Sequence, residues 1–335
     1  MSGAAAVVGA GSWGTALANL LAANGWRVRL WARNPALADA MRRERRNPRY
    51  LAEFPLADGV EPTSDLAEAV SGAAIVVAST PSHAVREVMG AAAPHLEAGA
   101  IVVSTSKGVE NDSLKRMTEV LAEVLGEDRR LAVLSGPSFA VEVSRGVPTA
   151  VTVASRDGAV AEAARDAFAA PRFRVYTSTD VIGVELGGAV KNVIAIATGI
   201  VDGLAYGDNA RAALVTRGLA EMSRLGTALG GERLTFMGLA GLGDLVLTCT
   251  GDLSRNRAVG LRLGRGQSLE EILADMTMVA EGVRTTRSVR DLAARADVQM
   301  PITEEVHEIL YHAKRPEVSV EQLMTREFKP EFERR

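Results

Sequence analysis

The stretch that decides the fold is Gly9-Ala10-Gly11-Ser12-Trp13-Gly14, a G-x-G-x-x-G sequence near the amino terminus. An apolar run at residues 4–8 precedes it, and an amphipathic run at residues 14–23 follows it. In such a strand–turn–helix unit, the first glycine permits a tight turn, the second lets a pyrophosphate approach the backbone, and the third lets helix and strand pack closely. The helix N-terminus then faces the phosphates. The stretch therefore predicts a dinucleotide-binding unit.

The alternation of strand and helix patterns continues through the first half of the chain. Further apolar β-type runs lie at residues 27–31, 74–78, 100–104, 131–134, 149–153 and 173–176. Helical patterns between them lie at residues 35–46, 82–93, 113–125 and 159–169. Continuous apolar strands separated by helices predict a parallel sheet that is covered on both faces.

After about residue 180 the strand patterns disappear and helical periodicity dominates. The expected helices lie at residues 181–205, 211–229, 254–264, 268–275, 285–296, 302–312 and 318–325. We therefore expect an α/β protein with a Rossmann-like dinucleotide-binding domain at residues 1–180 and an all-helical substrate and catalytic domain at residues 181–335. A functional cleft is expected between them, because ligands of such folds bind beside the carboxyl ends of the strands.

Composition and charge exclude several classes of function. The chain carries 38 Lys plus Arg and 41 Asp plus Glu, a net charge of −3, so it lacks the basic excess typical of nucleic-acid and membrane-surface proteins. Its single cysteine fits a reducing compartment. The uncharged first 26 residues lack a basic leader, and the apolar run 193–201 is far shorter than the roughly 20 residues that span a bilayer. We expect a cytoplasmic protein without membrane insertion.

The end of the second expected strand bears on the choice of dinucleotide. Residues 29–34 read Arg-Leu-Trp-Ala-Arg-Asn, with no carboxylate to bind a free 2′-hydroxyl. Arg33 is placed to stack on adenine or to meet a 2′-phosphate, which favours NADP(H), with NAD(H) as the alternative cofactor. The competing interpretation is that Arg33 is a solvated surface arginine.

Lysines and phosphate-binding groups recur in three later segments. Ser106-Lys107-Gly108 follows the fourth expected strand, and residues 135–140 follow the fifth. Lys191 lies inside the apolar run 186–201, where burial lowers the pKa of an ammonium from about 10.4. Lowered toward neutrality, Lys191 can protonate a developing alkoxide. Alternatively, it extends to solvent or pairs with Glu185.

Two further segments favour the catalytic interpretation. Asp244, expected in a glycine-flanked turn at residues 241–244, could orient Lys191 or accept a hydrogen bond from a substrate hydroxyl. Arg255 and Asn256, at the start of an expected helix, offer donors to a phosphate, helped by the helix N-terminus.

The remaining nucleophile and metal-ligand candidates receive no catalytic role. Cys249 is expected to be a small buried thiol. His307 and His312 are five residues apart and do not share a helical face as an H-E-x-x-H pair would. We predict no metal site.

These segments together resemble the NAD(P)-dependent glycerol-3-phosphate dehydrogenases of bacterial type. The resemblance rests on residues 9–14, 106–108, 136–138, 185–192, 241–250 and 254–257, in the family's order. Gly-Leu-Gly-Asp-Leu-x-x-Thr-Cys-Thr and Ser-Arg-Asn-Arg are its most specific parts. It implies reversible reduction of dihydroxyacetone phosphate to sn-glycerol 3-phosphate with NAD(P)H, supplying glycerophospholipid synthesis, and is compatible with a homodimer.

The resemblance also implies roles for individual residues. Lys191 would donate and accept the proton, with Lys107 and Asp244 beside it in the catalytic group. The implied substrate contacts are Lys107, Gly136, Ser138, Lys191, Asn192, Asp244, Thr248, Ser254, Arg255 and Asn256. The implied cofactor contacts are Gly9, Gly11, Ser12, Trp13, Gly14, Arg33, Tyr50, Lys107, Ala140, Arg255, Val279 and Glu281.

Two rival interpretations stay open at this point. The first is another β-hydroxyacid-type dehydrogenase with the same domain plan, which segments 241–250 and 254–257 argue against. The second is a redox-sensing dinucleotide-binding module without catalysis, which the joint presence of Lys107, Lys191 and Asp244 argues against.

Overall fold

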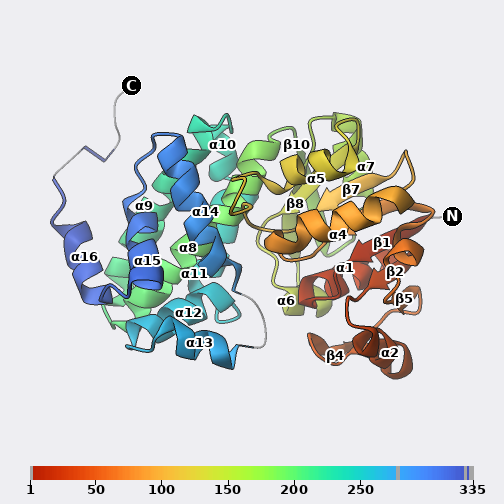
Figure 1. Cartoon of the computed structure of the whole chain (residues 1–335), viewed down its shortest axis with the longest axis horizontal. Helices are drawn as coiled ribbons and strands as arrows, with labels where there is room; N and C mark the ends of the chain where they lie inside the picture. Colours follow the sequence, from red (N-terminus) through yellow and green to blue (C-terminus); the bar gives the residue numbers. More distant parts are fainter. Residues whose placement is uncertain (1–2, 277–279, 328–329, 332–335) are drawn as a thin grey trace.

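A computed structural model describes residues 3–276, 280–327 and 330–331, and it divides into a sheet half and a helical half (Figure 1). The sheet half holds eight strands in the order β10-β9-β8-β7-β6-β1-β2-β5. These strands are β1 Ala4–Val8, β2 Arg27–Trp31, β5 Val60–Thr63, β6 Ala73–Ala78, β7 Ile101–Ser104, β8 Arg130–Ser135, β9 Thr149–Ala154 and β10 Phe173–Ser178. A separate two-stranded sheet pairs β3 Arg46–Asn47 with β4 Leu51–Pro55.

The expected parallel sheet is only partly parallel. β8 and β9 pair antiparallel, so β9 and β10 run against the other six strands. The connection from β8 to β9 contains only the five-residue helix α6, Ala140–Ser144. A helix of that length spans about 7.5 Å, whereas six strand residues span about 20 Å, so α6 cannot return the chain along the sheet for a parallel crossover.

The edge strand β5 was not expected from the sequence, because Pro62 interrupts its pattern. Proline removes a backbone donor and is therefore tolerated in a sheet mainly at an edge. β5 is the last strand in the order and pairs only with β2 among the described strands. Helix α3, Leu66–Val70, follows it directly and was also unexpected.

Helices cover both faces of the sheet, as the sequence predicts. One hydrophobic core packs the sheet against α1 Ser12–Ala23, α2 Pro35–Glu44 and α7 Gly158–Phe168. The core on the opposite face packs it against α3, α4 Val85–Ala92 and α5 Met117–Leu125. Successive residues of β1 alternate between the two cores, since neighbouring side chains on a strand point to opposite faces.

Helix α8, Val181–Gly203, is the centre of the helical half. The other elements of this half are α9 Gly207–Ala228, α10 Arg233–Phe236, the π-helical turn η3 Leu239–Gly243, α11 Asp244–Thr250, α12 Arg255–Gly264, α13 Leu269–Asp275, α14 Glu281–Arg295, α15 Pro301–His312 and α16 Pro316–Met324. The apolar run 193–201 is therefore part of a 23-residue helix, which is long and apolar enough to cross a membrane. The expectation that this run is too short to span a bilayer is therefore wrong. However, 94% of the most apolar stretch of α8 is buried inside the protein, as in the core helix of a globular domain.

Glycines let α8 and α12 touch along their backbones. A Cβ at Gly199 of α8 would lie 2.1 Å from the carbonyl oxygen of Arg257, and one at Gly260 of α12 would lie 2.0 Å from that of Ile196. Gly203 and Gly264 continue the same seam. The start of α12 is therefore held close to the middle of α8.

Candidate active site

The glycine turn after β1 has the geometry that its motif predicts. Gly9 has a φ of +122°, which disfavours a side chain. A Cβ on Gly14 would lie 1.9 Å from the carbonyl oxygen of Gly9, so only glycine lets α1 start this close to the strand. A Cβ on Gly11, in contrast, would meet no atom within 4 Å. The backbone at Gly11 therefore faces open space at the N-terminus of α1, as a pyrophosphate requires.

Several of the implied cofactor residues surround this turn. The Ser12 hydroxyl donates to the carbonyl oxygen of Tyr50 at 2.7 Å, which joins α1 to the loop between β3 and β4. Arg33 is exposed two residues beyond β2. Ala140 begins α6, which packs against α1. Val279 lies outside the described residues.

A residue that the sequence did not single out, Asn47, fixes the Tyr50 loop. It is fully buried, and its side-chain amide donates to the carbonyl oxygen of Ala10 at 2.9 Å and to the Thr15 hydroxyl at 2.8 Å. No local pattern in the sequence marks it, because both partners lie more than 30 residues away.

Unpartnered polar atoms gather at the carboxyl ends of the strands. Among the described residues, buried atoms without a hydrogen-bond partner include Trp13 Nε1, Thr80 Oγ1 and Ser135 Oγ, which follow or end β1, β6 and β8. Buried polar groups are normally satisfied, so these atoms have hydrogen-bonding capacity that a bound ligand could use. Together with the open space at Gly11, they fit a dinucleotide laid across this edge.

The second part of the site is a cluster of two lysines and an aspartate. The Lys191 ammonium donates to Asp244 Oδ1 at 2.7 Å and to the Thr248 hydroxyl at 2.7 Å. Lys107, from the loop after β7, donates to Asp244 Oδ2 at 2.5 Å and to the carbonyl oxygen of Gly136 at 3.1 Å. Asp244 therefore lies between two ammonium groups that come from opposite halves of the molecule.

Burial and charge together set the pKa values in this cluster. Burial lowers the pKa of Lys191 to about 8, with Lys107 also lowering it and Asp244 opposing the shift. Burial alone would raise the pKa of Asp244, but Lys107 and Lys191 outweigh it and hold that pKa below its ordinary value. The cluster therefore keeps an ionised carboxylate beside an ammonium that loses its proton at mildly alkaline pH, around 8.

The structure corrects two expectations about this cluster. Asp244 is the first residue of helix α11, preceded by the π-helical turn η3, and does not lie in a simple glycine turn. Glu185 is not the partner of Lys191, because its carboxylate accepts hydrogen bonds from Arg116 and Thr118. The buried Lys191 does not extend to solvent either.

A chain of amides connects the lysine cluster to the start of α12. Asn192 donates to the carbonyl oxygen of Lys107 at 3.4 Å and accepts from the Asn256 side chain at 2.9 Å. The oxygen of Asn256 in turn accepts from the Gly282 backbone N–H at 2.9 Å. Asn192, the residue after Lys191 in α8, and Asn256 of α12 thus connect α8, α12 and α14 beside the lysine cluster.

The first turn of α12 has the features expected of a phosphate end. The buried Ser254 caps the helix by accepting from the Arg257 backbone N–H at 3.2 Å. Arg255 is exposed, whereas Arg257 is held in ion pairs with Asp202 and Asp252. Because Arg255 is more exposed than Arg257, it is the arginine of this turn that an anion meets first.

Glu281 connects the first turn of α14 to the sheet half. Its carboxylate accepts from the backbone N–H of Ser82, two residues past Thr80, at 2.9 Å. Burial raises the pKa of Glu281, although this hydrogen bond and the nearby Arg255 oppose the rise. On the sheet side, Ser138 donates to the carbonyl oxygen of Gly136 at 2.9 Å, the same oxygen that Lys107 contacts.

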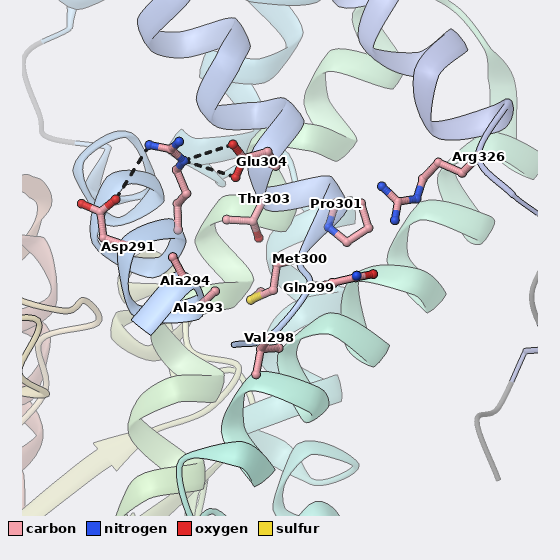
Figure 2. A pocket seen from close by; sticks show the side chains of 11 residues that line it. Asp291, Ala293, Ala294, Val298, Gln299, Met300, Pro301, Thr303, Glu304 and Arg326 are labelled. Atoms are coloured by element: carbon pink, nitrogen blue, oxygen red, sulfur yellow. Dashed lines mark hydrogen bonds and ion pairs between the residues drawn. The ribbon is translucent and has the colours of Figure 1, made fainter. Parts of the chain in front are cut away.

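Two other features lie away from this site. A cavity of about 440 Å³ opens between α14, the start of α15 and Arg326 (Figure 2), where Arg290 pairs with Glu304 and Asp291. On α15, the rings of His307 and His312 approach to 5.4 Å between centroids despite their five-residue spacing. No function is assigned to either feature.

Comparisons with known proteins agree with this geometry. Residues 4–161 match the family described as NAD-dependent glycerol-3-phosphate dehydrogenase N-terminus, and residues 180–321 match its C-terminus. The chain is 55% identical to glycerol-3-phosphate dehydrogenase [NAD(P)+] of Syntrophotalea carbinolica, over 98% of this chain and 99% of the relative. It is 57% identical to that of Moorella thermoacetica, over 92% of each. The crystal structure of glycerol-3-phosphate dehydrogenase from Coxiella burnetii superposes with a TM-score of 0.94 at 43% identity, over 97% of this chain and 99% of that chain.

Proposed function

Because this chain belongs to the NAD-dependent glycerol-3-phosphate dehydrogenase family, we propose that it reduces dihydroxyacetone phosphate to sn-glycerol 3-phosphate, reversibly, with NADP(H) or NAD(H). The observation that carries the proposal is the Lys107–Asp244–Lys191 cluster at the carboxyl ends of β7 and β8. It supplies an acid–base group at the same edge of the sheet as the turn that fits a dinucleotide.

The residues divide the chemistry between them. The dinucleotide, when bound, supplies or accepts the hydride. Lys191 protonates the carbonyl oxygen of the substrate as negative charge builds on it, and its ammonium stabilises that charge before the proton is transferred. Asp244 holds Lys191 in place, and Lys107 offers a second positive charge near the reacting carbon. In the reverse direction the neutral amine of Lys191 takes the proton from the hydroxyl.

The remaining residues of the site bind the substrate and the cofactor. For the substrate, Arg255 and the first turn of α12 hold the phosphate, far enough from the reacting carbon to fix its orientation. The other substrate contacts in the proposal are Gly136, Ser138, Asn192, Thr248, Ser254 and Asn256. The cofactor contacts are Gly9, Gly11, Ser12, Trp13, Gly14, Arg33, Tyr50, Lys107, Ala140, Arg255, Val279 and Glu281.

The exposed position of Arg33 supports a preference for the phosphorylated dinucleotide. Replacing Arg33 with aspartate is expected to raise the KM for NADPH by about 10- to 100-fold, because it removes a cation at the 2′-phosphate and adds a repelling charge. The KM for NADH should change much less, since its 2′-hydroxyl can donate to the new carboxylate. Steady-state kinetics with each dinucleotide measures both values. Equal changes for the two would remove Arg33 from the 2′-phosphate site.

The proposal extends to the cellular role of the protein. It is a cytoplasmic enzyme without membrane insertion, works as a homodimer and supplies sn-glycerol 3-phosphate for glycerophospholipid synthesis. In this proposal the chain consists of two domains, a dinucleotide-binding domain at residues 1–180 and a substrate domain at residues 181–335. The change from strands to helices between β10 and α8 supports this division.

One assay tests the activity directly. The purified chain is mixed with NADPH and dihydroxyacetone phosphate, and the loss of dinucleotide absorbance is followed. We expect turnover that depends on both reactants and stops when the phosphate is absent from the substrate. Bound NADPH without turnover would instead support a non-catalytic dinucleotide-binding protein, and turnover of a hydroxy acid lacking phosphate would support another dehydrogenase.

A further inference from the structure

A short segment of the sheet half is embedded in the core of the helical half. The segment is residues 109–116, which we call the strap; it follows Gly108 and ends where α5 begins. Val109 is 3% exposed and belongs to a buried hydrophobic cluster whose other described members all lie between residues 186 and 310. Leu114 packs against the same cluster. The strap therefore belongs to the helical half by packing, although it belongs to the sheet half by sequence.

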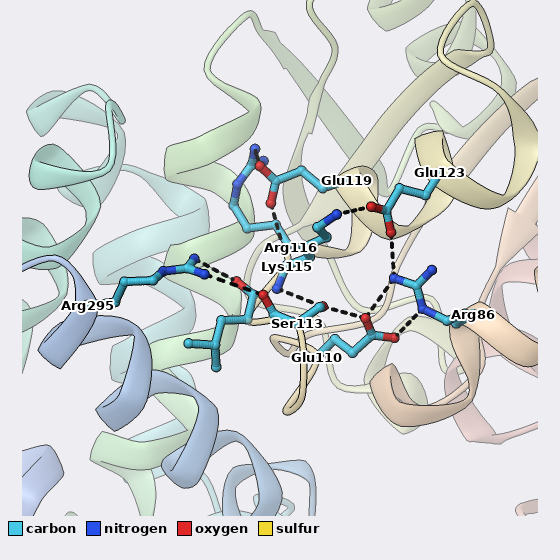
Figure 3. Close-up of polar contacts among 9 residues, drawn as sticks. Arg86, Glu110, Ser113, Lys115, Arg116, Glu119, Glu123 and Arg295 are labelled. Atoms are coloured by element: carbon cyan, nitrogen blue, oxygen red, sulfur yellow. Dashed lines mark hydrogen bonds and ion pairs between the residues drawn. The ribbon is translucent and has the colours of Figure 1, made fainter.

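The strap is closed into a compact loop by its own backbone. Val109 and Arg116 form an antiparallel bridge, and the Glu110 N–H donates to the carbonyl oxygen of Lys115 at 3.0 Å. Leu114 has a φ of +57°, a left-handed conformation that a leucine adopts only when its surroundings hold it. Ion pairs of Arg86 with Glu110 and Glu123 fasten the loop to α4 and α5 (Figure 3).

Glu185 of α8 anchors the far end of the strap. One carboxylate oxygen accepts from the Thr118 backbone N–H at 2.7 Å, and the other accepts from the Thr118 hydroxyl at 2.7 Å and from Arg116 at 2.5 Å. The Glu185 side chain is only 4% exposed, and that of Arg116 only 9%. Arg295 of α14 adds longer contacts of 3.5 Å to the carbonyl oxygens of Ser113 and Leu114.

A member of the lysine cluster lies just before the strap in the chain. Lys107 precedes Val109 by two residues, and its ammonium lies 2.5 Å from Asp244. Glu185 lies on the helix that carries Lys191, so one helix holds both the acid–base group and the anchor of the loop that brings Lys107 to it. We propose that Glu185 is a positioning residue that acts through the strap to keep Lys107 against Asp244 during the reaction.

This inference rests on the proposed function, because Lys107 and Lys191 act in that reaction. Replacing Glu185 with glutamine keeps the side-chain volume but removes the ion pair, and its amide turns a donor toward either Arg116 or Thr118. The strap then loosens and Lys107 moves away from Asp244. Misplacement on the ångström scale costs up to about a hundredfold in rate, so we expect kcat to fall by roughly 10- to 100-fold while NADPH binding is retained.

The pKa of Lys191 distinguishes positioning from a general loss of stability. The charged or ionisable groups that affect Lys191 are Asp244, Lys107 and Cys249, and Lys107 lowers its pKa. Loosening Lys107 should therefore raise the pKa of Lys191 and move the alkaline limit of the kcat–pH profile upward. The chain has only five lysines, so NMR titration of lysine-labelled protein can measure this pKa without any turnover.

Glu221 provides a matched control. It is 2% exposed and, like Glu185, caps another helix, accepting from the backbone N–H groups of Ile302 at 2.7 Å and Thr303 at 3.3 Å at the start of α15. Within the described part of the chain, its hydrogen bonds go to α15 and none goes to the strap. Glu221→Gln should lower the unfolding temperature and leave the pKa of Lys191 where it is.

Three outcomes separate the possibilities. A raised Lys191 pKa and faster hydrogen exchange across the strap in Glu185→Gln, with neither change in Glu221→Gln, would support the inference. An unchanged Lys191 pKa, or kinetics of Glu185→Gln that match those of Glu221→Gln, would overturn it. If the wild-type protein fails to reduce dihydroxyacetone phosphate, the proposed function fails. The NMR and exchange measurements then still report whether Glu185 sets the position of Lys107.

Discussion

Replacing Lys191 with methionine is expected to lower kcat for dihydroxyacetone phosphate reduction by about 10²- to 10⁴-fold, the usual contribution of a general acid. Methionine fills a similar volume within α8 and adds no polar group to its apolar surroundings. Asp244 keeps an ion pair with Lys107 at 2.5 Å, so the substitution leaves no isolated buried charge. The fold should therefore survive, and the Kd for NADPH should stay nearly unchanged.

Steady-state kinetics and NADPH fluorescence titration measure the two effects separately. Lys314→Met is a suitable control, because Lys314 is also ion-paired, at 2.5 Å to Glu305, and is partly buried, but it lies just beyond the end of α15. It should keep wild-type kcat. A Lys191→Met enzyme that retains more than about a tenth of the wild-type kcat would show that another group supplies the proton.

Asp244→Asn is expected to lower kcat for the reduction by about a hundredfold at pH 8. The substitution changes both the protonation and the position of the Lys191 ammonium. Asp244 is the group that opposes the lowering of the Lys191 pKa from 10.5 to about 8. Without its negative charge, burial and Lys107 should lower this pKa further. Reduction needs the ammonium form, so its alkaline limit should move to lower pH. Oxidation needs the neutral amine and should lose less activity at alkaline pH.

Measuring kcat against pH for both the reduction and the oxidation tests these two expectations: a lower alkaline limit for the reduction and a smaller loss of activity for the oxidation. Asp202→Asn is the matched control, since Asp202 has a side chain that is only 6% exposed and also lies between two cations, Arg211 at 2.6 Å and Arg257 at 2.8 Å. It should reduce stability without moving the alkaline limit of the reduction. A limit that moves upward in Asp244→Asn would contradict the assignment of Asp244 as the group that sustains the charge of Lys191.

The sequence predicts the elements that carry a strong local signal. The continuous apolar runs of β1, β6 and β7 and the long apolar helix α8 needed no further information. The predicted direction of β9 is wrong, because the apolar pattern of a strand is the same whether it pairs parallel or antiparallel. The strand β5 was missed because Pro62 conceals it. The helical start at Asp244 was missed because glycines, which disfavour helices, form the π-helical turn before it.

The candidate site shows the same division between local and distant information. The motifs single out Lys107, Lys191 and Asp244, and the structure brings these three together. The structure also excludes the two alternatives for Lys191, because Lys191 is buried away from solvent and Glu185 pairs with Arg116 instead. The roles of Asn47 and of the strap could not be predicted, since each depends on contacts between residues far apart in the chain.

The glycine seam between α8 and α12 limits how this enzyme can be made more heat-resistant. Exchanging a helical glycine for alanine commonly raises the free energy of unfolding by about 0.4–1 kcal/mol, because it reduces the conformational entropy of the unfolded chain. At Gly199 or Gly260 the new methyl group would overlap a carbonyl oxygen of the facing helix at 2.1 or 2.0 Å. The helices would have to separate, and the displaced α12 would carry Arg255 away from Lys191. Thermostability engineering should therefore exclude this seam and use solvent-facing glycines instead.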